Sequence, residues 1–295
     1  MGNVKTAIFV GLTTVDFVYS ISDDIRENTK YAASEFDVFA GGPAANAAIT
    51  YSLLGGAAFL YTCVGTNAIS QIARLELDKY GVAITDLSPT STTHLPLSSI
   101  VTSPASHNRT VFSAHEIVQM PIDLCQLDLM NHRYETVLID GHLLEISSTM
   151  ANRGILTGTC VVLDGGSWKS GLDEILPYVD YAICSASFRP PNCKELHDAV
   201  AYLFEAGIAY MAFTHDDKPI KWWTSDASGE IPTEPINAID TLAAGDIFHG
   251  AFIAALGREH LGFEGALRYA AHIASQSCRY FGPREWHSHI NSGDF

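Results

Sequence analysis

The segment Asp240-Thr-Leu-Ala-Ala-Gly-Asp246 holds the residues of this sequence that are best suited to chemistry. Small side chains at 243–245 leave the backbone accessible, and the apolar pattern after them predicts the start of a helix. A glycine-containing turn at a helix N-terminus points free N–H groups outward, which suits a phosphate or a developing anion. Asp246, in the first turn, could then accept a proton from a hydroxyl nucleophile. The alternative interpretation is an N-capping aspartate before an ordinary buried helix.

A second segment, Gly41-Gly42-Pro-Ala-Ala-Asn46, combines close backbone approach with a versatile polar side chain. Paired glycines let the backbone come near a ligand, and Asn46 offers both donors and acceptors for sugar hydroxyls. Taken alone, the segment favours a tight turn and an alanine-rich packed helix, with Asn46 hydrogen-bonded internally. Because the aspartate motif follows about two hundred residues later, we favour the binding interpretation for the pair.

Both segments resemble signatures of the ribokinase-like (PfkB) carbohydrate kinases, and the resemblance covers nearly the whole chain. It implies that Asp246 is the catalytic base and that the backbone amides of Ala243, Ala244 and Gly245 form an anion hole. It also implies a sugar site, which we expect to contain Asp16, Gly41, Gly42, Asn46 and Arg109. The residues of the two motifs are most similar to those of the ketohexose and sulfofructose kinase branch of that family.

Asp16 and Arg109 lie outside the two motifs. Asp16 follows the first predicted strand, where the family usually has an aspartate that binds two substrate hydroxyls, and a carboxylate can accept from both. An exposed turn aspartate is the alternative. Arg109 begins a predicted hairpin strand and matches a frequent family position facing the site, where it could neutralise a phosphate. A solvated arginine at a hairpin end is the alternative there.

On the phosphoryl-donor side the resemblance implies ATP and Mg²⁺, but the sequence departs from the family pattern twice. Ser185-Ala-Ser-Phe188 stands where the family has an Asn-x-x-Glu-like motif that organises magnesium. We therefore expect Asp164 to supply the carboxylate for Mg²⁺ instead. Thr214-His-Asp-Asp-Lys-Pro219 replaces a glycine-containing nucleotide loop, and its aspartates would repel a triphosphate unless they point away. We expect Ser185 and Thr214 near the nucleotide, and a monovalent cation such as K⁺ near Asp240 and 278–288.

Strand-like and helix-like segments alternate along most of the chain, which implies a mostly parallel sheet covered on both faces. The predicted strands are 7–12, 57–64, 136–140, 159–164, 181–185 and 209–214, and the predicted helices include 43–54, 69–80 and 192–206. Four further strands, 16–21, 36–40, 97–102 and 109–114, predict a small projecting sheet. We therefore expect a single ribokinase-like domain over 1–295, a three-layer α/β/α sandwich with a β-lid from about 14–40 and 96–115.

Composition narrows the class of partner. The chain has 33 acidic against 17 basic residues and a net charge of −16, which argues against binding to nucleic acid. No apolar stretch approaches the length needed to span a bilayer, and the first twenty residues lack the shape of a signal peptide. The six cysteines are scattered, which favours free thiols in a reducing compartment. We expect a cytoplasmic protein without a membrane partner.

Three functional hypotheses remain open from the sequence. The leading one is an ATP- and Mg²⁺-dependent kinase that phosphorylates a hydroxyl of a small carbohydrate, with a nucleoside kinase as a variant. The second is a sugar-binding module that has lost efficient phosphoryl transfer. A nicotinamide-dependent oxidoreductase is disfavoured, because no Gly-x-Gly-x-x-Gly follows the first strand. Exposed edges of the lid predict a homodimer. The sequence does not identify the sugar, the phosphorylated carbon or the preferred donor.

Overall fold

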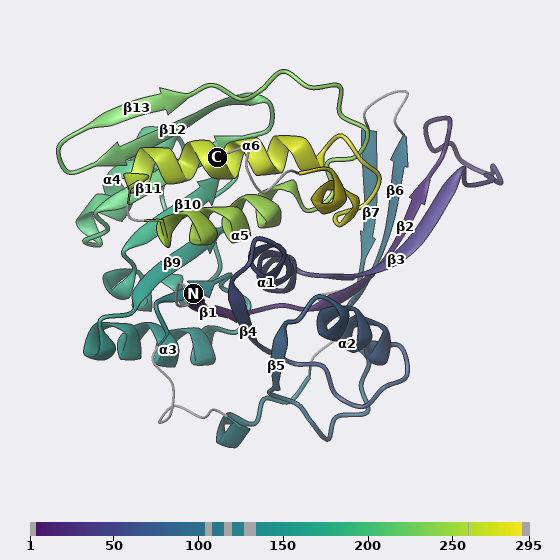
Figure 1. Cartoon of the computed structure of the whole chain (residues 1–295), viewed down its shortest axis with the longest axis horizontal. Coiled ribbons are helices and arrows are strands. Elements are labelled where there is room, and N and C mark those ends of the chain that lie inside the picture. The colour runs from purple at the N-terminus through teal and green to yellow at the C-terminus, as the bar shows by residue number, and fades with distance from the viewer. Residues whose placement is uncertain (1–3, 104–107, 115–119, 127–133, 259, 291–295) are drawn as a thin grey trace.

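The computed structural model describes residues 4–103, 108–114, 120–126, 134–258 and 260–290. It contains a three-layer α/β/α sandwich and a separate small sheet at one side (Figure 1). This architecture confirms the predicted fold class. Parts of the predicted lid, residues 104–107 and 115, lie outside the described residues.

The central sheet has nine strands in the order β13-β12-β11-β10-β9-β8-β1-β4-β5. All neighbours from β11 to β5 pair in parallel, and β12 and β13 pair antiparallel. The strands are β1 (Thr6–Val10), β4 (Ala57–Thr62), β5 (Ala83–Asp86), β8 (Thr136–Ile139), β9 (Cys160–Gly165), β10 (Tyr181–Ser185), β11 (Tyr210–His215), β12 (Lys218–Thr224) and β13 (Ser228–Ile231). The parallel strands match those predicted from apolar runs except β5, which was not predicted.

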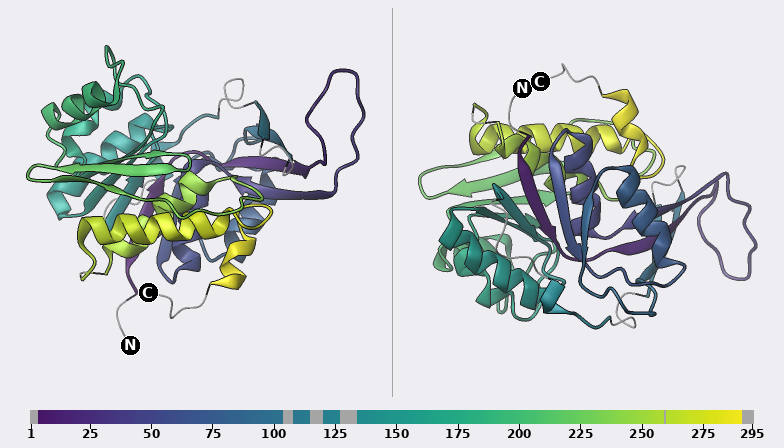
Figure 2. Two further views of the ribbon diagram at one scale, coloured as in Figure 1. Left: turned by 90° about the horizontal axis from the view of Figure 1, so that it is seen from above. Right: turned by 60° about the horizontal axis from the view of Figure 1, so that its bottom comes forward.

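Helices cover both faces of this sheet, as Figure 2 shows from above. Alternate residues of β1 explain why: Ala7 and Phe9 join one buried cluster, whereas Ile8 and Val10 join the other. A strand buried on both faces reads as a continuous apolar run. The first cluster includes residues of α1 (Pro43–Leu53), α2 (Ser70–Lys79), α5 (Ala244–Leu256) and α6 (Gly262–Ser277), and the second residues of α3 (Leu144–Thr157) and α4 (Leu196–Glu205). None of the helices within the described ranges is long and apolar enough to cross a membrane.

The small sheet, called the lid sheet below, stands at the edge of the sandwich (Figure 1). Its strands are β2 (Thr14–Ser20), β3 (Glu35–Gly41), β6 (Leu97–Ser103) and β7 (Asn108–Ser113), in the order β3-β2-β6-β7. Two antiparallel hairpins from separate parts of the chain are joined by parallel pairing of β2 with β6. This arrangement confirms the four predicted strands and their two origins.

The antiparallel end of the central sheet differs from the loop that we expected over 214–219. Thr214 ends β11 with His215, and a turn at Asp216 and Asp217 leads directly into β12. Asp216 has a φ of 47°, a left-handed conformation that aspartate tolerates better than most residues. The segment is therefore a tight hairpin turn rather than an open loop.

Candidate active site

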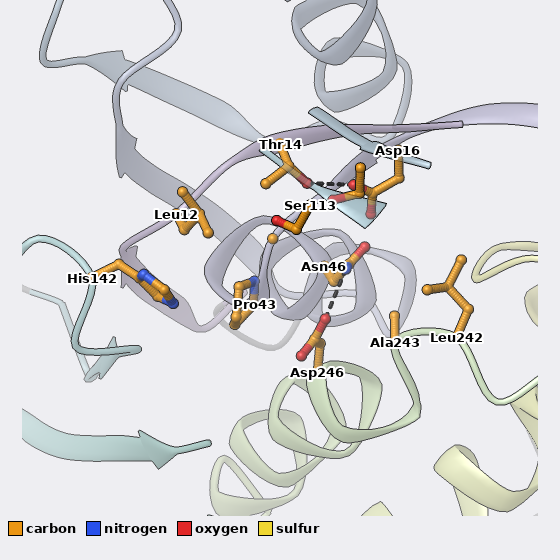
Figure 3. A pocket seen from close by; sticks show the side chains of 12 residues that line it. Leu12, Thr14, Asp16, Pro43, Asn46, Ser113, His142, Leu242, Ala243 and Asp246 are labelled. Carbon is orange, nitrogen blue, oxygen red and sulfur yellow. Dashed lines mark hydrogen bonds between the residues drawn. The ribbon is translucent and has the colours of Figure 1, made fainter. Parts of the chain in front are cut away.

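A pocket of about 310 Å³ lies where the lid sheet meets the carboxyl ends of the central strands (Figure 3). This position is the switch point of the sheet, where the chain runs from β1 to one side and later returns on the other through β8. Ligands of open α/β sheets bind at such points. The pocket is lined by Leu12, Thr14, Asp16, Gly42, Pro43, Asn46, Ser98, Ser113, His142, Leu242, Ala243 and Asp246.

The N-terminus of α5 forms one wall of the pocket. Ala243 has a φ of 57°, and this left-handed residue turns the chain into α5, which begins at Ala244. The space beside Gly245 is open, because a methyl group placed there would meet nothing within 4 Å. The Ala244 N–H donates to the Thr241 carbonyl oxygen at 3.3 Å. The positive end of the helix dipole, the other N–H groups of the first turn and the open space together make this terminus fit an anion.

Asp246 lies in the first turn of α5 and reaches the pocket. Its pKa is raised from 3.8 to about 7, mainly by burial and next by the nearby Asp164 carboxylate, while Asn46 and His249 lower it. The Asn46 Nδ2 atom donates a hydrogen bond of 2.8 Å to Asp246 Oδ2 (Figure 3). A carboxylate with a pKa near neutrality is suited to accept a proton at neutral pH.

The Gly41-Gly42 segment brings the lid sheet and α1 together around the pocket. Gly42 has a φ of 95° and caps α1, and a side chain there would collide with the carbonyl oxygen of Leu12. A side chain at Gly41 would collide with Asp16 and Thr14. Gly42 is therefore required by close approach to the backbone of Leu12, and Gly41 by close approach to the side chains of Asp16 and Thr14, which is the tight packing that the sequence analysis gave as its alternative.

Asp16 is buried at the base of β2 and lines the pocket. It accepts hydrogen bonds from the Thr14 hydroxyl, at 2.7 Å, and from the Ser98 side chain. Burial raises the pKa of Asp16, and these two hydroxyls lower it. The exposed-turn alternative for Asp16 is thus wrong, and its carboxylate already sits among hydroxyl donors of the kind a sugar would offer.

Asp140, which the sequence analysis placed only as a strand end, fixes the floor of the pocket. It is buried, and it accepts backbone N–H groups from Leu12 at 2.8 Å, His142 at 2.9 Å and Ala44 at 3.3 Å. These residues belong to the loop after β1, the loop after β8 and the first turn of α1. The single carboxylate therefore ties together three segments that line the pocket.

Asp164, at the end of β9, lies behind the pocket beside His249 of α5. Both are buried, with 3.5 Å between Asp164 Oδ2 and His249 Nδ1. The two ring nitrogens of His249 also face the carbonyl oxygens of Gly245, at 2.7 Å, and Ile183, at 3.1 Å. Burial raises the pKa of Asp164, and His249 lowers it. His249 is buried within the protein and contacts the carboxylate expected near Mg²⁺.

The remaining predicted donor residues do not line this pocket. The Ser185 hydroxyl donates to the carbonyl oxygen of Gly166 at 2.6 Å, and Thr214 contacts the Cys184 carbonyl oxygen at 3.4 Å. Both side chains stand at the carboxyl ends of neighbouring strands, β10 and β11. They share the carboxyl-end edge of the sheet with Asp164, whose strand β9 pairs with β10.

Arg109 and Asp240 are placed at the rim of the site. Arg109 is exposed on β7 and reaches the Thr241 carbonyl oxygen at 3.3 Å, without lining the pocket. Asp240 is buried and accepts the N–H groups of Leu242, at 2.9 Å, and Gly282, at 3.0 Å. Among the described residues, no cluster of three or more His, Cys, Asp or Glu could hold a metal ion.

Comparison with known proteins identifies the family. The model of the pfkB family carbohydrate kinases matches residues 5–289. The chain belongs to the pfkB family of carbohydrate kinases. Its architecture also carries the fold of solved members of this family, which confirms the resemblance inferred from the two motifs.

The relatives of this pfkB chain described here are distant but cover most of its length. A ribokinase of Haemophilus influenzae is 24% identical over 288 residues, which is 92% of each chain. A proposed ribokinase structure from Agrobacterium tumefaciens has a TM-score of 0.81 at 22% identity, covering 97% of this chain and 94% of that one. A proposed ribokinase II from E. coli, in complex with ATP and Mg²⁺, has a TM-score of 0.76 at 17% identity and covers 96% of each chain.

Sequence reasoning missed several residues that build the pfkB pocket. Ser98, Ser113 and His142 line it, yet none stands in a recognisable motif. Asp140 had one usable signal, since a polar residue at the carboxyl end of a parallel strand lies where such sheets bind ligands. Arg284, which contacts Asn46 from the C-terminal segment, had none.

Proposed function

We propose that this chain transfers the γ-phosphoryl group of ATP to a hydroxyl of a small carbohydrate. Asp246 removes the hydroxyl proton, the new bond forms between that oxygen and the γ-phosphorus, and the bond to the β–γ bridging oxygen breaks to release ADP. The amides of Ala243, Ala244 and Gly245 stabilise the transferred group. The observation that carries this proposal is Asp246, half-buried with a pKa raised to about 7, at an open helix N-terminus that lines the pocket.

The acceptor end of the pocket favours a single sugar. Asp16 can accept from substrate hydroxyls and Asn46 can donate, while Gly42 lets the ligand approach the backbone. A volume of about 310 Å³ is at the lower end of small-molecule pockets, which range from about 300 to 1,000 Å³. This size supports a monosaccharide over a nucleoside, which stays the variant acceptor.

The donor end is proposed for ATP along the ends of β9, β10 and β11, with Asp164, Ser185 and Thr214. When bound, Mg²⁺ would neutralise charge on the transferred phosphoryl group. One buried carboxylate, Asp164, fits a Mg²⁺ site completed by phosphate oxygens and water. We propose Asp240 for a monovalent cation such as K⁺, and this role stays a prediction, as does the ketohexose branch.

A sugar-binding module with weak phosphoryl transfer is the second candidate. It is favoured by the donor end, where Ser185 and Ser187 stand in place of an acidic motif and Asp216 and Asp217 form the turn after β11. Under this candidate the acceptor pocket binds sugar and the turnover of ATP is low.

The decisive experiment measures ADP release with ATP and Mg²⁺ across ketoses, aldoses, sugar phosphates and nucleosides, with Asp246→Asn as the matched variant. Release that depends on one acceptor and is lost in the variant would support the kinase. A sugar that raises the melting temperature without ADP release would support the binding module instead. Release unchanged by Asp246→Asn would reject the proposed base.

We further propose a cytoplasmic homodimer that associates through the lid sheet. Phe36 of β3 and Phe112 of β7 are each more than half exposed, on the two edge strands of that sheet. Edge strands with exposed apolar side chains favour pairing. Sedimentation should find a dimer that Phe112→Ser weakens, and a native monomer would contradict the proposal.

A further inference from the structure

Arg284 is a buried cation that has no role in the phosphoryl transfer proposed above. It lies between α6 and the short 3₁₀ helix Glu285–His289, and its side chain is only 5% exposed. Its Nη2 atom donates to the Ala40 carbonyl oxygen at 2.6 Å and to Asn46 Oδ1 at 2.9 Å. Its Nε atom donates to Glu76 Oε1 at 2.9 Å. A residue near the C-terminus therefore contacts the segment that leads into Gly41-Gly42.

Glu76, on α2, holds the other side of this arrangement. One carboxylate oxygen accepts from Arg284, and the other accepts the backbone N–H of Ala40. Arg284 and Glu76 together thus bind both the N–H and the carbonyl group of Ala40. The ion pair is fixed by hydrogen bonds to the end of β3, just before α1 and the pocket.

The contact with Arg284 determines which way the Asn46 amide points. A guanidinium group can only donate hydrogen bonds, so the face of Asn46 toward Arg284 must be its oxygen. The NH₂ group then faces the opposite way and donates to Asp246, as Figure 3 shows. Glu76, Arg284, Asn46 and Asp246 form a continuous chain of donors and acceptors, with each contact between 2.8 and 2.9 Å.

We infer that Arg284 is a positioning residue for the catalytic base: it locks the Asn46 amide so that Asn46 donates to, and keeps ionised, the Asp246 carboxylate. This inference rests on the proposed function, in which Asp246 is the base. Without Arg284, the amide is free to turn and present its oxygen to Asp246. Two acceptors would then face each other unless the carboxyl group holds a proton.

The orientation of the Asn46 amide affects the ionisation of Asp246, because few of the groups around Asp246 favour its charged form. Asp164 on β9 and Asp16 on β2 raise the pKa of Asp246, whereas Asn46 on α1 and His249 on α5 lower it. Arg284 also lowers the pKa of Asp16, and Glu76 raises it. Asn46 and His249 are the two groups that lower the pKa of Asp246. Loss of the Asn46 hydrogen bond removes one of them, so this pKa should rise.

The test follows the ionisation of Asp246 directly, by ¹³C NMR of the aspartate carboxyl carbons, with the signal assigned by Asp246→Asn. The variants are Arg284→Lys and the double variant Glu76→Gln/Arg284→Met, which leaves no unpaired buried carboxylate. Arg74→Met is the matched control. Arg74 lies on α2, like Glu76, and it forms an ion pair with Asp86 at 2.6 Å rather than with Asn46.

We expect the Asp246 titration to move up by about one pH unit in the double variant, by less in Arg284→Lys, and not in Arg74→Met. If the chain phosphorylates a sugar, kcat/KM of the double variant should fall about tenfold at pH 6 and recover toward the native value at pH 9. An unmoved titration, or an equal loss of rate at every pH, would overturn the inference. A moved titration without any kinase activity would support the lock while rejecting the proposed function.

Discussion

The acceptor end and the donor end of this site are built differently. At the acceptor end, Asp16 and Asp140 are buried and Asp246 is half-buried, and each accepts a hydrogen bond from another segment of the chain. At the donor end, Ser185 hydrogen-bonds the Gly166 carbonyl oxygen and the neighbouring Ser187 hydroxyl, and Asp216 is largely exposed. Groups that must be ionised in a precise place are fixed before any ligand binds, because burial makes an unpartnered charge costly. Among the residues that the structure describes, Asp164 is the one buried charge at the donor end.

This comparison predicts the largest effect at Asp140. Asp140→Ala would leave the N–H groups of Leu12, Ala44 and His142 without their buried acceptor, so we expect a loss of roughly 3–5 kcal/mol in stability. Urea denaturation measures this, and Asp140→Asn should lose less because one oxygen remains. Ser185→Ala at the donor end should cost under about 1 kcal/mol. Equal losses of stability from Asp140→Ala and Ser185→Ala would contradict the difference between the two ends.

Asp246 should oppose folding at the pH where it is needed for catalysis. Its pKa rises from 3.8 to about 7 on folding, so the folded state loses stability as the pH increases from about 4 through 7. Asp246→Asn should therefore stabilise the protein at pH 8 by up to about 4 kcal/mol, with a smaller gain at pH 5. Denaturation curves at both values of pH check this. A stability gain that is independent of pH would contradict the raised pKa.

Gly42 tests the close backbone packing at the acceptor end. Gly42→Ala places a methyl group against the Leu12 carbonyl oxygen at a φ of 95°, so we expect a loss of about 1–3 kcal/mol and a higher KM for the sugar. Gly207→Ala is a matched control, since its φ is 94° but a methyl group there meets nothing within 4 Å. If both substitutions had the same effect, strain rather than crowding would explain the requirement for Gly42.

The smallest effect is expected at the donor end. Asp216→Asn removes an exposed charge from the hairpin turn, and screened surface charges contribute little. We expect KM for ATP to fall by about twofold with kcat unchanged, measured at low ionic strength. A change of tenfold or more would mean that the turn contacts the nucleotide closely, and it would narrow the difference between the two ends.

The parallel strands and the lid sheet could be predicted because each follows from local patterning. Apolar runs gave the buried strands, and alternation gave the four strands of the lid sheet. The β11–β12 hairpin was missed, because 214–219 was interpreted by its family resemblance as a nucleotide loop. Asp216 adopts a left-handed conformation between two strands that pair directly. Aspartate tolerates this conformation, so the local sequence is compatible with a tight turn.

The candidate site was predictable only where its residues belong to short motifs. Gly42, Asn46 and Asp246 stand in such motifs, and the structure brings them into one pocket. Asp140 and Arg284 act through contacts with residues 96 to 244 positions away, and no local pattern reports such contacts. Side chains that hold a site together are therefore harder to predict than side chains that line it.

The most direct test of the account is the pH dependence of kcat/KM for the sugar that gives the fastest ADP release. A base with a pKa of about 7 predicts a constant value above pH 8 and a tenfold fall for each pH unit below about 6.5. Circular dichroism at each pH would show that the protein stays folded. A flat profile from pH 5.5 to 8.5 would contradict Asp246 as the catalytic base.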